Sequence, residues 1–459
     1  MPEHKEGIVI AGAGLAGALM ALYLARRGFE VSVYEKRPDM RRETIPAGRS
    51  INLALANRGI TALEGAGVMD RVEPLLIPMR GRMIHDTDGG LDLQPYGNKP
   101  HEVINSVSRS ELNCRLMDAA EETGRVRIHF HQAIEDVDFN ARRLGVTDAR
   151  DGTRRTIECE RLIAADGAGS PVRKAMAAHT GMDVDIDMLE HGYKELNIPS
   201  DKDGQWQMER GALHIWPRGG YMLIALPNLD GSFTVTLFLP YEGEPSFDAL
   251  GTDSNRIRSF FEREFPDATR LMPELTDTFL ANPTGELGTV RCPQWRVDDF
   301  ALLIGDAAHA IVPFHGQGMN CAFEDCQELD LCLEETGGDW QRAFARLEER
   351  RRPNAQAIAD MALENYVEMR DSVRDPGFRL RKELGWLLEE RHPERFIPRY
   401  SMVMFHHLPY AEAQRRGRVQ AGILDELAAD IEQASELDED RADALIRERL
   451  EPVASAADR

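Results

Sequence analysis

The first 35 residues carry the hydrophobic pattern of a strand, a turn, a helix and a second strand. Residues 8–11 form a short apolar run with β-branched side chains, and residues 18–27 are rich in Ala and Leu at helical spacing. Gly28 ends the predicted helix, and residues 31–35 have the composition of a second strand. The pattern therefore predicts a βαβ unit whose first connection is a glycine-rich turn.

Two separate parts of the chain contain short alternating stretches of apolar and polar residues, divided by Gly, Pro, Asn and Asp. Such stretches are typical of half-buried strands joined by turns. We therefore predict an antiparallel sheet built from two separated insertions. Its predicted strands are residues 80–85, 91–96, 213–216, 221–226 and 233–239.

The segments between and after these insertions predict further elements. Residues 110–123 have helical spacing, whereas residues 126–130 and 162–165 have the composition of strands. Beyond Asp306 the pattern is mainly helical. The helices predicted there are residues 320–335, 340–351, 354–370, others beyond 376, and a charged, exposed helix at 425–450.

Length and charge narrow the class of protein. A chain of 459 residues is too long for one ordinary core, so two or three structural units are expected. The 55 basic and 78 acidic residues give a net charge of −23, which repels nucleic acid and anionic membranes at long range. Nucleic acid is therefore not an expected partner.

Cysteine usage and the termini indicate a cytoplasmic protein. The six cysteines include no CxxC pair and none of the spacings of zinc sites or disulfide scaffolds, so reduced thiols and no metal are expected. The N-terminus lacks the pattern of a secretion signal, and no segment approaches the roughly 18 apolar residues needed to span a bilayer.

The glycine-rich turn has the spacing of a dinucleotide-binding turn. Gly12 permits the tight turn, Gly14 lets the backbone approach a pyrophosphate, and Gly17 lets helix and strand pack closely. The helix start offers free N–H groups to phosphates, and Glu35 is placed to accept hydrogen bonds from ribose hydroxyls. A turn without a ligand is the alternative, and the turn alone does not distinguish FAD from NAD.

Two later segments favour FAD. Asp306 follows the apolar strand 301–304, where a carboxylate can bind a ribityl or ribose hydroxyl. Residues 316–320 precede a long helix whose N–H groups can stabilise negative charge on a reduced flavin. Together with an Asp-Gly segment at residues 166–173, these motifs suit the two ends of a long dinucleotide, although a plain strand-to-helix connection is the alternative.

With these motifs the chain resembles the FAD-dependent aromatic hydroxylases, in the glycine turn, residues 165–173 and Gly305-Asp306. The resemblance runs from about residue 8 to about residue 416 and is closer to the members that hydroxylate L-kynurenine. Unlike mitochondrial members, the chain has no C-terminal membrane helix, and in this it resembles the soluble bacterial form. The segments that carry the closer resemblance are residues 48–55, 80–83, 94–97, 191–196, 309–320, 364–369 and 396–402.

The resemblance implies a set of cofactor and substrate residues. Arg82 would pair with the carboxylate of the substrate, although an ordinary strand charge is the alternative, as packing is for the tyrosines. The implied cofactor residues are Gly12, Gly14, Leu15, Ala16, Gly17, Glu35, Lys36, Arg37, Ala54, Arg109, Asp166, Asp306, Gly318, Met319 and Asn320. The implied substrate residues are Arg82, Tyr96, Asn365, Glu368, Tyr400, Phe238, Phe314, His315 and Met369.

The resemblance also implies a mechanism. No second glycine fingerprint follows a strand, so NADPH is expected to reduce FAD and leave before oxygen reacts. The hypothesis is that a C4a-hydroperoxyflavin hydroxylates L-kynurenine to 3-hydroxy-L-kynurenine, with apolar residues excluding water. No side chain is a certain catalytic residue. His315 is a candidate, but His309 and His315 lie in no nucleophile or metal constellation in the sequence, which favours packing or hydrogen bonding near the flavin.

These observations predict an α/β protein with three parts. A discontinuous Rossmann-like FAD-binding domain takes residues 1–76, 99–180 and 285–370, and a substrate-binding sheet domain takes 77–98 and 181–284. Residues 371–459 form a C-terminal helical region. Alternative functions are hydroxylation of another amino-bearing aromatic, such as anthranilate, and a flavin oxidase or redox sensor. The pathway, tryptophan catabolism or quinolinate and NAD biosynthesis, stays open, as do the NADPH or NADH preference and the oligomeric state, a homodimer included.

Overall fold

The computed structural model describes residues 5–43, 52–369 and 376–453, and the motif residues 48–51 lie outside this part. Contacts divide the chain into two compact units. Whereas the sequence suggested three parts, the helices beyond Asp360 belong to the second unit. The first unit comprises Met1–Leu76, Ser106–Leu189 and Glu286–Ala359, and the second comprises Ile77–Asn105, Glu190–Gly285 and Asp360–Arg459.

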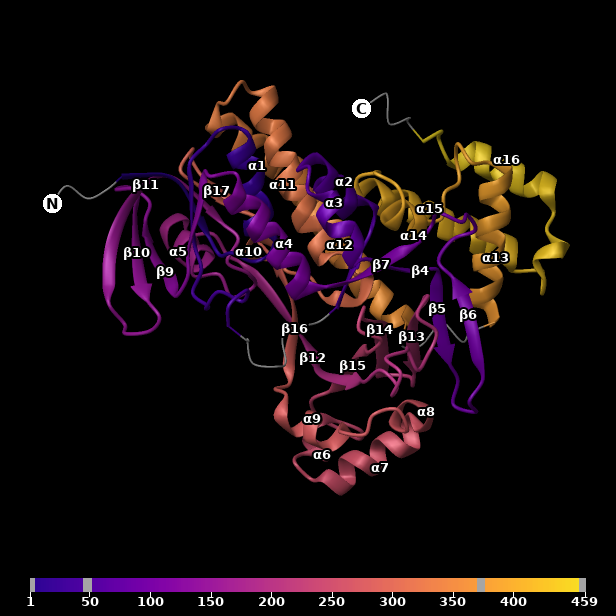
Figure 1. Ribbon diagram of the computed structural model, residues 1–459. Coiled ribbons are helices and arrows are strands. Elements are labelled where there is room, and N and C mark those ends of the chain that lie inside the picture. Colours follow the sequence, from indigo (N-terminus) through magenta and orange to yellow (C-terminus); the bar gives the residue numbers. More distant parts are fainter. Residues whose placement is uncertain (1–4, 44–51, 370–375, 454–459) are drawn as a thin grey trace. The chain divides into compact units, whose positions relative to one another are not determined.

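The first unit is built on an eight-stranded sheet with a central parallel part (Figure 1). The parallel strands lie in the order β18-β11-β1-β2-β8, while β17 pairs antiparallel with β18. The strands β9 and β10 extend β11 as an antiparallel hairpin. The bounds are β1 Lys5–Ala11, β2 Val31–Tyr34, β8 Val126–His129, β9 Gln132–Asp138, β10 Arg143–Asp148, β11 Arg154–Ala164, β17 Arg296–Val297 and β18 Ala301–Leu303.

The register of this sheet brings the predicted motifs to one edge. Ala11 at the end of β1 lies opposite Tyr34 of β2 and Ala164 of β11, and Ala164 lies opposite Leu303 of β18. Because all four strands are parallel, the chain leaves each of them at the same carboxyl edge. This edge is where open α/β sheets bind their ligands.

Helices pack on this sheet around a common core. Helix α1 packs against α4 and α11, and every residue from Gly17 to Ala25 is buried, as expected for a helix that is apolar all round. Ser108 caps α4 by accepting a hydrogen bond from the Glu111 N–H. The first unit's helices include α1 Leu15–Arg26, α2 Asn57–Gly65, α3 Met69–Val72, η1 Glu73–Leu75, α4 Arg109–Glu122, α5 Pro171–Thr180, α10 Asp306–His309, η2 Pro313–His315 and α11 Gly318–Glu335.

The second unit contains the sheet predicted from the two insertions, with one difference. Its strands lie in the order β12-β15-β14-β13-β5-β6, and all neighbours are antiparallel except β5 and β13. The predicted antiparallel sheet is present, and the two insertions join at β5 and β13, the one pair of these strands that runs parallel. The bounds are β5 Gly81–His85, β6 Leu91–Pro95, β12 Asp185–Ile198, β13 Ala212–Pro217, β14 Met222–Pro227 and β15 Phe233–Pro240, with β16 Gly285–Arg291 beside β12.

Two apolar cores hold the second unit. Phenylalanines of α7, α9 and their connection, among them Phe260, Phe261 and Phe279, pack against buried residues of the sheet. Leu388, Ile423 and other residues of the C-terminal helices form a separate core. The helices are α6 Phe247–Leu250, α7 Ser254–Glu264, α8 Pro266–Thr269, α9 Leu275–Ala281, α13 Pro376–Arg391, α14 Arg399–Met404, α15 Tyr410–Ala428, η4 Ala434–Glu436 and α16 Glu439–Arg449.

Two helix predictions were wrong in their boundaries. The helices predicted at 340–351 and 354–370 are one helix, α12 Trp340–Val367, with Pro353 inside it. Asn354 donates a side-chain hydrogen bond to the Arg350 carbonyl, which is next to the Glu349 carbonyl whose N–H partner the proline lacks. The exposed helix predicted at 425–450 is instead the end of α15, η4 and α16, whose Leu427 and Ile446 are buried.

The remaining strands of the described chain are short. They are β3 Asn52–Leu55, β4 Ile77–Met79 and β7 Ile104–Ser108. Of these, β3 matters for the site because it begins the segment that Asn320 holds in place.

Candidate functional site

The glycine turn between β1 and α1 leaves space for a ligand at one glycine only. A Cβ on Gly12 would lie 2.7 Å from the Ala165 carbonyl oxygen, and one on Gly17 would lie 2.0 Å from the Gly12 carbonyl oxygen. These two glycines are therefore required by the protein's own packing. A Cβ on Gly14, the N-cap of α1, would meet no protein atom within 4 Å. The open space at Gly14 fits a pyrophosphate approaching the helix N-terminus.

Glu35 is fixed against this turn by its own hydrogen bonds. Its Oε2 accepts from the Ala13 N–H at 2.9 Å, and its Oε1 accepts from the backbone and Nε of Arg37 at 2.9 and 2.8 Å. Burial opposes the charge of Glu35, but the hydrogen bonds and charge of Arg37 outweigh burial and hold its pKa below the ordinary value. An ionised, oriented carboxylate therefore stands at the predicted ribose position, with Lys36 exposed beside it.

Helix α4 presents Arg109 on the same side as the turn. Asn113 donates from Nδ2 to the Ala13 carbonyl oxygen at 3.0 Å, so this face of α4 touches the turn. Arg109 precedes Asn113 by one helical turn on that face, and its side chain is exposed. An exposed cation on the face of α4 that contacts the glycine turn is consistent with the predicted cofactor role of Arg109.

The Asp-Gly segment joins the glycine turn to the Gly305 segment. Asp166 follows β11, and a Cβ on Gly12 would touch its Cα at 3.1 Å. Burial raises the pKa of Asp166, and its Oδ1 has no hydrogen-bond partner among the described residues. Arg173 is buried and donates to the Ala307 carbonyl oxygen at 3.0 Å. The three motifs of the sequence are therefore neighbours in space, as predicted.

The N-terminus of α11 is open to a ligand. No side chain caps it, and its first turn contains no acidic residue. Asn320 is fully buried and uses its amide within the protein, donating to the Ala54 and Gly316 carbonyl oxygens and accepting from the Ala56 N–H, each at 2.9 Å. Asn320 therefore shapes the segment around Ala54, whereas Gly318 and Met319 begin the helix whose N–H groups stay available.

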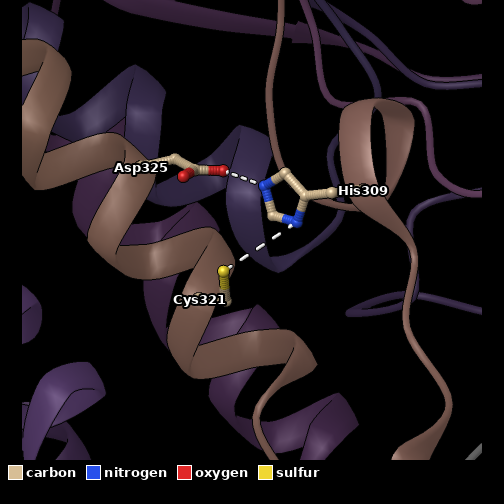
Figure 2. Close-up of side chains that lie close together, drawn as sticks. All are labelled: His309, Cys321 and Asp325. Carbon is tan, nitrogen blue, oxygen red and sulfur yellow. Dashed lines mark hydrogen bonds and ion pairs between the residues drawn. The ribbon is translucent and has the colours of Figure 1, made fainter. Parts of the chain in front are cut away.

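A buried charged network braces this region (Figure 2). Asp325 of α11 accepts from His309 Nε2 at 2.6 Å, from the Gly305 N–H at 2.9 Å and from Arg351 Nε at 2.8 Å. Burial opposes the charges, but His309 and Arg351 lower the pKa of Asp325 to about 2. The charge of Asp325 likewise keeps the pKa of His309 well above its ordinary value, against the effect of burial.

This network corrects the interpretation of His309. The sequence placed His309 in no constellation, yet its ring lies between Asp325 and Cys321. Arg351 contacts both Asp325 Oδ1 at 2.8 Å and Cys321 Sγ at 3.2 Å, and a buried guanidinium disfavours a metal there. Asp325 was missed, although an Asp at i+4 from Cys321 in the apolar stripe of a helix was a usable signal.

The observed groups fit FAD. The open space at Gly14, the unpartnered Asp166 Oδ1, the exposed carboxylate of Asp306 and the uncapped start of α11 all lie in the first unit. The space at Gly14 suits a pyrophosphate, the two aspartates suit hydroxyl groups, and the start of α11 suits the electron-rich edge of a flavin.

In the second unit, Arg82 lies at the centre of the predicted substrate residues. Its guanidinium carbon is 5.0 Å from the ring centroid of Tyr400 and 6.0 Å from that of Tyr96, and the two rings stack at 5.8 Å. Arg82 Nη1 donates to Glu368 Oε1 at 3.2 Å, whereas its Nε has no acceptor among the described residues. Burial raises the pKa values of both tyrosines, so both stay neutral donors.

Further residues surround this cluster. Asn365 is buried and contacts the Met369 sulfur at 3.4 Å. Lys382, which the sequence gave no reason to select, donates to the Pro95 carbonyl oxygen at 3.0 Å. Burial, and then the charge of Arg82, lower the pKa of Lys382 to about 8. The second unit thus brings two cationic groups, Arg82 and Lys382, within electrostatic reach of one another, with Arg82 beside two tyrosines.

The other predicted substrate residues belong to β15 of the second unit and to η2 of the first unit. Phe238 is buried in β15 beside Tyr193, with ring centroids 6.5 Å apart. Phe314 and His315 form part of η2 in the first unit, where both are buried. The structure brings the predicted cofactor residues together in one unit and most of the predicted substrate residues together in the other.

Comparison with known proteins identifies the family. A model of the FAD binding domain family matches residues 6–362. Kynurenine 3-monooxygenase of Myxococcus xanthus is 48% identical over 98% of this chain and 96% of its own length, and that of Stenotrophomonas maltophilia is 50% identical over 92% of both chains.

Solved structures agree on the fold. The oxygenase of 2-methyl-3-hydroxypyridine-5-carboxylic acid has a TM-score of 0.66 at 22% identity, covering 81% of this chain and 94% of its own. The p-nitrophenol 4-monooxygenase of Pseudomonas putida has a TM-score of 0.66 at 18% identity, covering 92% and 98%. Among the described residues, no helix combines the length and apolarity needed to cross a bilayer. The resemblance drawn from the motifs is confirmed, and the chain belongs to the FAD-dependent hydroxylase family that includes these kynurenine 3-monooxygenases.

Proposed function

We propose that this chain is an FAD-dependent monooxygenase that uses NADPH and O₂ to convert L-kynurenine to 3-hydroxy-L-kynurenine. The family membership and the names of relatives at 47–50% identity support the reaction. The observation that carries the substrate assignment is Arg82, a buried guanidinium with an Nε–H that no described residue accepts. A buried donor without an acceptor suits the carboxylate of an amino-acid substrate.

The side chains around Arg82 can hold both charged groups of an amino acid. The Nε–H of Arg82 donates to the substrate carboxylate, and the neutral hydroxyls of Tyr96 and Tyr400 add donors. Glu368, whose side chain is 26% exposed, accepts from the substrate ammonium. The stacked tyrosine rings also stabilise the guanidinium by cation–π contact, which keeps it in place when the substrate leaves.

FAD, reduced by NADPH, supplies the activation of O₂ and the oxygen transfer. Gly14 and the start of α1 would bind its pyrophosphate, and Glu35 and Arg109 its adenosine half. Asp306 and the N–H groups of Gly318 and Met319 would bind the flavin half. The amino group on the aromatic ring of kynurenine already donates electron density, so the chain need not supply a strong general base.

Turnover of the purified protein tests the proposal. We expect NADPH oxidation that depends on kynurenine, with 3-hydroxykynurenine formed in equal amount by chromatography. NADPH oxidation that yields only H₂O₂ with kynurenine would contradict the proposal and support an oxidase. Hydroxylation of anthranilate in preference to kynurenine would assign a different aromatic substrate.

The state of the cysteines supports a cellular compartment for the enzyme. All six cysteines are free, and five of them are buried. We therefore place the enzyme in the reducing cytoplasm, where such thiols persist. Fractionation of cells that contain the natural protein tests this location.

A further inference from the structure

The second unit contains a cluster of metal-ligand side chains that the proposed reaction does not use. One ligand atom each from Glu102, Glu389 and His406 lie within 4.8 Å of one another. Glu102 precedes β7, Glu389 belongs to α13 and His406 follows α14, so three separate segments meet here. Both carboxylates are only 3% exposed.

The charges of this cluster are not balanced. Lys99 Nζ lies 2.5 Å from Glu389 Oε1 and 3.4 Å from Glu102 Oε1, so one ammonium serves two buried carboxylates. The other oxygen of Glu389, Oε2, is buried and has no hydrogen-bond partner among the described residues. An unpaired buried carboxylate oxygen is costly, and such an atom indicates an ion that completes the site.

His406 is suited to bind a metal. It contributes one imidazole nitrogen to the cluster, and neutral imidazole is a common metal ligand in proteins. One imidazole nitrogen and two carboxylate oxygens, with water in a fourth position, form a ligand set that Zn²⁺ accepts. Mg²⁺ instead requires about six oxygen ligands in an octahedron.

Lys99 can leave the site, unlike the cation of the His309 cluster. The Lys99 side chain is 40% exposed on a flexible stem, whereas the Arg351 side chain is 4% exposed and holds two carboxylates. Ligand atoms around zinc lie about 3.4 Å apart, given bonds of about 2.0–2.1 Å. Small side-chain rotations would therefore close the site once the ammonium moved into solvent.

We propose that Glu102, Glu389 and His406 bind a divalent transition-metal ion of the Zn²⁺ class, which takes the place of the Lys99 ammonium. The ion would link α13 to the segment before β7, which carries Glu102, and to the segment after α14, which carries His406. Glu102 follows Tyr96 by six residues and His406 follows Tyr400 by six, so the ion would brace the segments that carry both tyrosines beside Arg82. Zinc binding itself does not depend on the proposed reaction.

Zinc titration of the tag-free, FAD-loaded protein, after removal of metals with a chelator, tests the proposal. Calorimetry should show one saturable Zn²⁺ per chain, and Zn²⁺ should raise the melting temperature where equal Mg²⁺ does not. Glu389→Gln should weaken zinc binding by at least about tenfold. Glu390→Gln, the same charge change at the exposed neighbour on α13, should leave zinc binding unchanged.

Lys99→Met separates a metal site from an ordinary ion-pair cluster. Without zinc this variant should melt at a lower temperature, because two buried carboxylates lose their counter-charge. With zinc it should bind more tightly than the unsubstituted chain and regain its melting temperature, because the competing ammonium is gone. The proposal would be overturned if neither the unsubstituted chain nor Lys99→Met bound zinc saturably. It would also be overturned if Glu389→Gln and Glu390→Gln lost zinc binding equally. If Glu389→Gln fails to fold, Lys99→Met decides alone.

Discussion

The cofactor site of the first unit and the Arg82 cluster of the second select their ligands by different means. Around Gly14 the proposed selecting feature is the backbone, since an open space and the N–H groups of the α1 N-terminus would bind a phosphate. Around Arg82 it is a set of side chains from β5, the end of β6, α14 and the end of α12. We therefore expect binding at the first site to be sensitive to changes of the backbone, and binding at the second to changes of charge.

Substitutions in the two regions should differ in how far they affect folding stability as well as ligand binding. In the first unit, the residues that shape the backbone also hold the fold together, as the hydrogen bonds of Asn320 and Asp325 show. In the second unit, Arg82 has one ion pair among the described residues, none of which accepts its Nε–H, so its loss should affect substrate more than fold. Five substitutions, each with a comparison variant or profile, test this difference.

Asp325→Asn should have the largest effect. It removes the charge that holds both His309 and Arg351 in a buried network, so the free energy of unfolding should fall by about 3–5 kcal/mol. FAD affinity should fall with it, because Asp325 also positions the Gly305 N–H. Denaturant unfolding and FAD titration measure the two effects. Glu334→Gln, on an exposed part of the same helix, should cost less than about 1 kcal/mol, and an equal cost for both variants would refute the bracing role.

Gly17→Ala should mainly lower the stability of the fold, whereas Gly14→Ala should mainly weaken cofactor binding. The Cβ of the first would lie 2.0 Å from a backbone oxygen, so the apoprotein should lose about 1–3 kcal/mol of stability. The Cβ of the second meets no protein atom, so the apoprotein should change by no more than about 1 kcal/mol while FAD binding weakens. Thermal unfolding of apoprotein and FAD fluorescence titration test the pair. Normal FAD binding by Gly14→Ala would place the pyrophosphate elsewhere.

Arg82→Met should act mainly on substrate. Loss of a charge-assisted pair worth about 1.5–3 kcal/mol should raise the KM for kynurenine by about 10- to 150-fold, with a smaller change in kcat. Arg82→Lys should recover part of the loss, since a point charge replaces a bidentate donor. Arg80→Met, at an exposed position two residues earlier, is the matched control. Steady-state kinetics in which Arg82→Met equals this control would remove Arg82 from the substrate site.

Lys382 should add a small pH dependence. Its pKa of about 8 means that its charge is present below pH 8 and is lost as pH rises through that value. The positive charge near the substrate carboxylate then falls, and the KM for kynurenine should rise about two- to fivefold between pH 7 and pH 9. Lys382→Met should lack this component. Dividing the KM profile of the unsubstituted chain by that of Lys382→Met separates the contribution of Lys382 from the titration of kynurenine itself. Parallel profiles for the two proteins would rule out a role for Lys382.

The sequence could predict the motifs that depend on local backbone geometry. The spacing of Gly12, Gly14 and Gly17 within a βαβ pattern is contained in a few tens of residues, and the parallel sheet brings the later motifs to the same edge. The family resemblance then supplied Arg82, Tyr96 and Tyr400, which the structure gathers in one cluster.

By itself the sequence determined about half of the strands, the glycine turn and the order of the cofactor motifs, because each depends on neighbouring residues and on periodicity. Only the tertiary structure decided that β5 runs parallel to β13, that Asp325 pairs with Arg351 and His309, and that Glu102 meets Glu389. These are contacts between distant segments, set by how the elements pack. Burial then fixes which charges must be paired, since an unpaired charge is costly only where water is excluded.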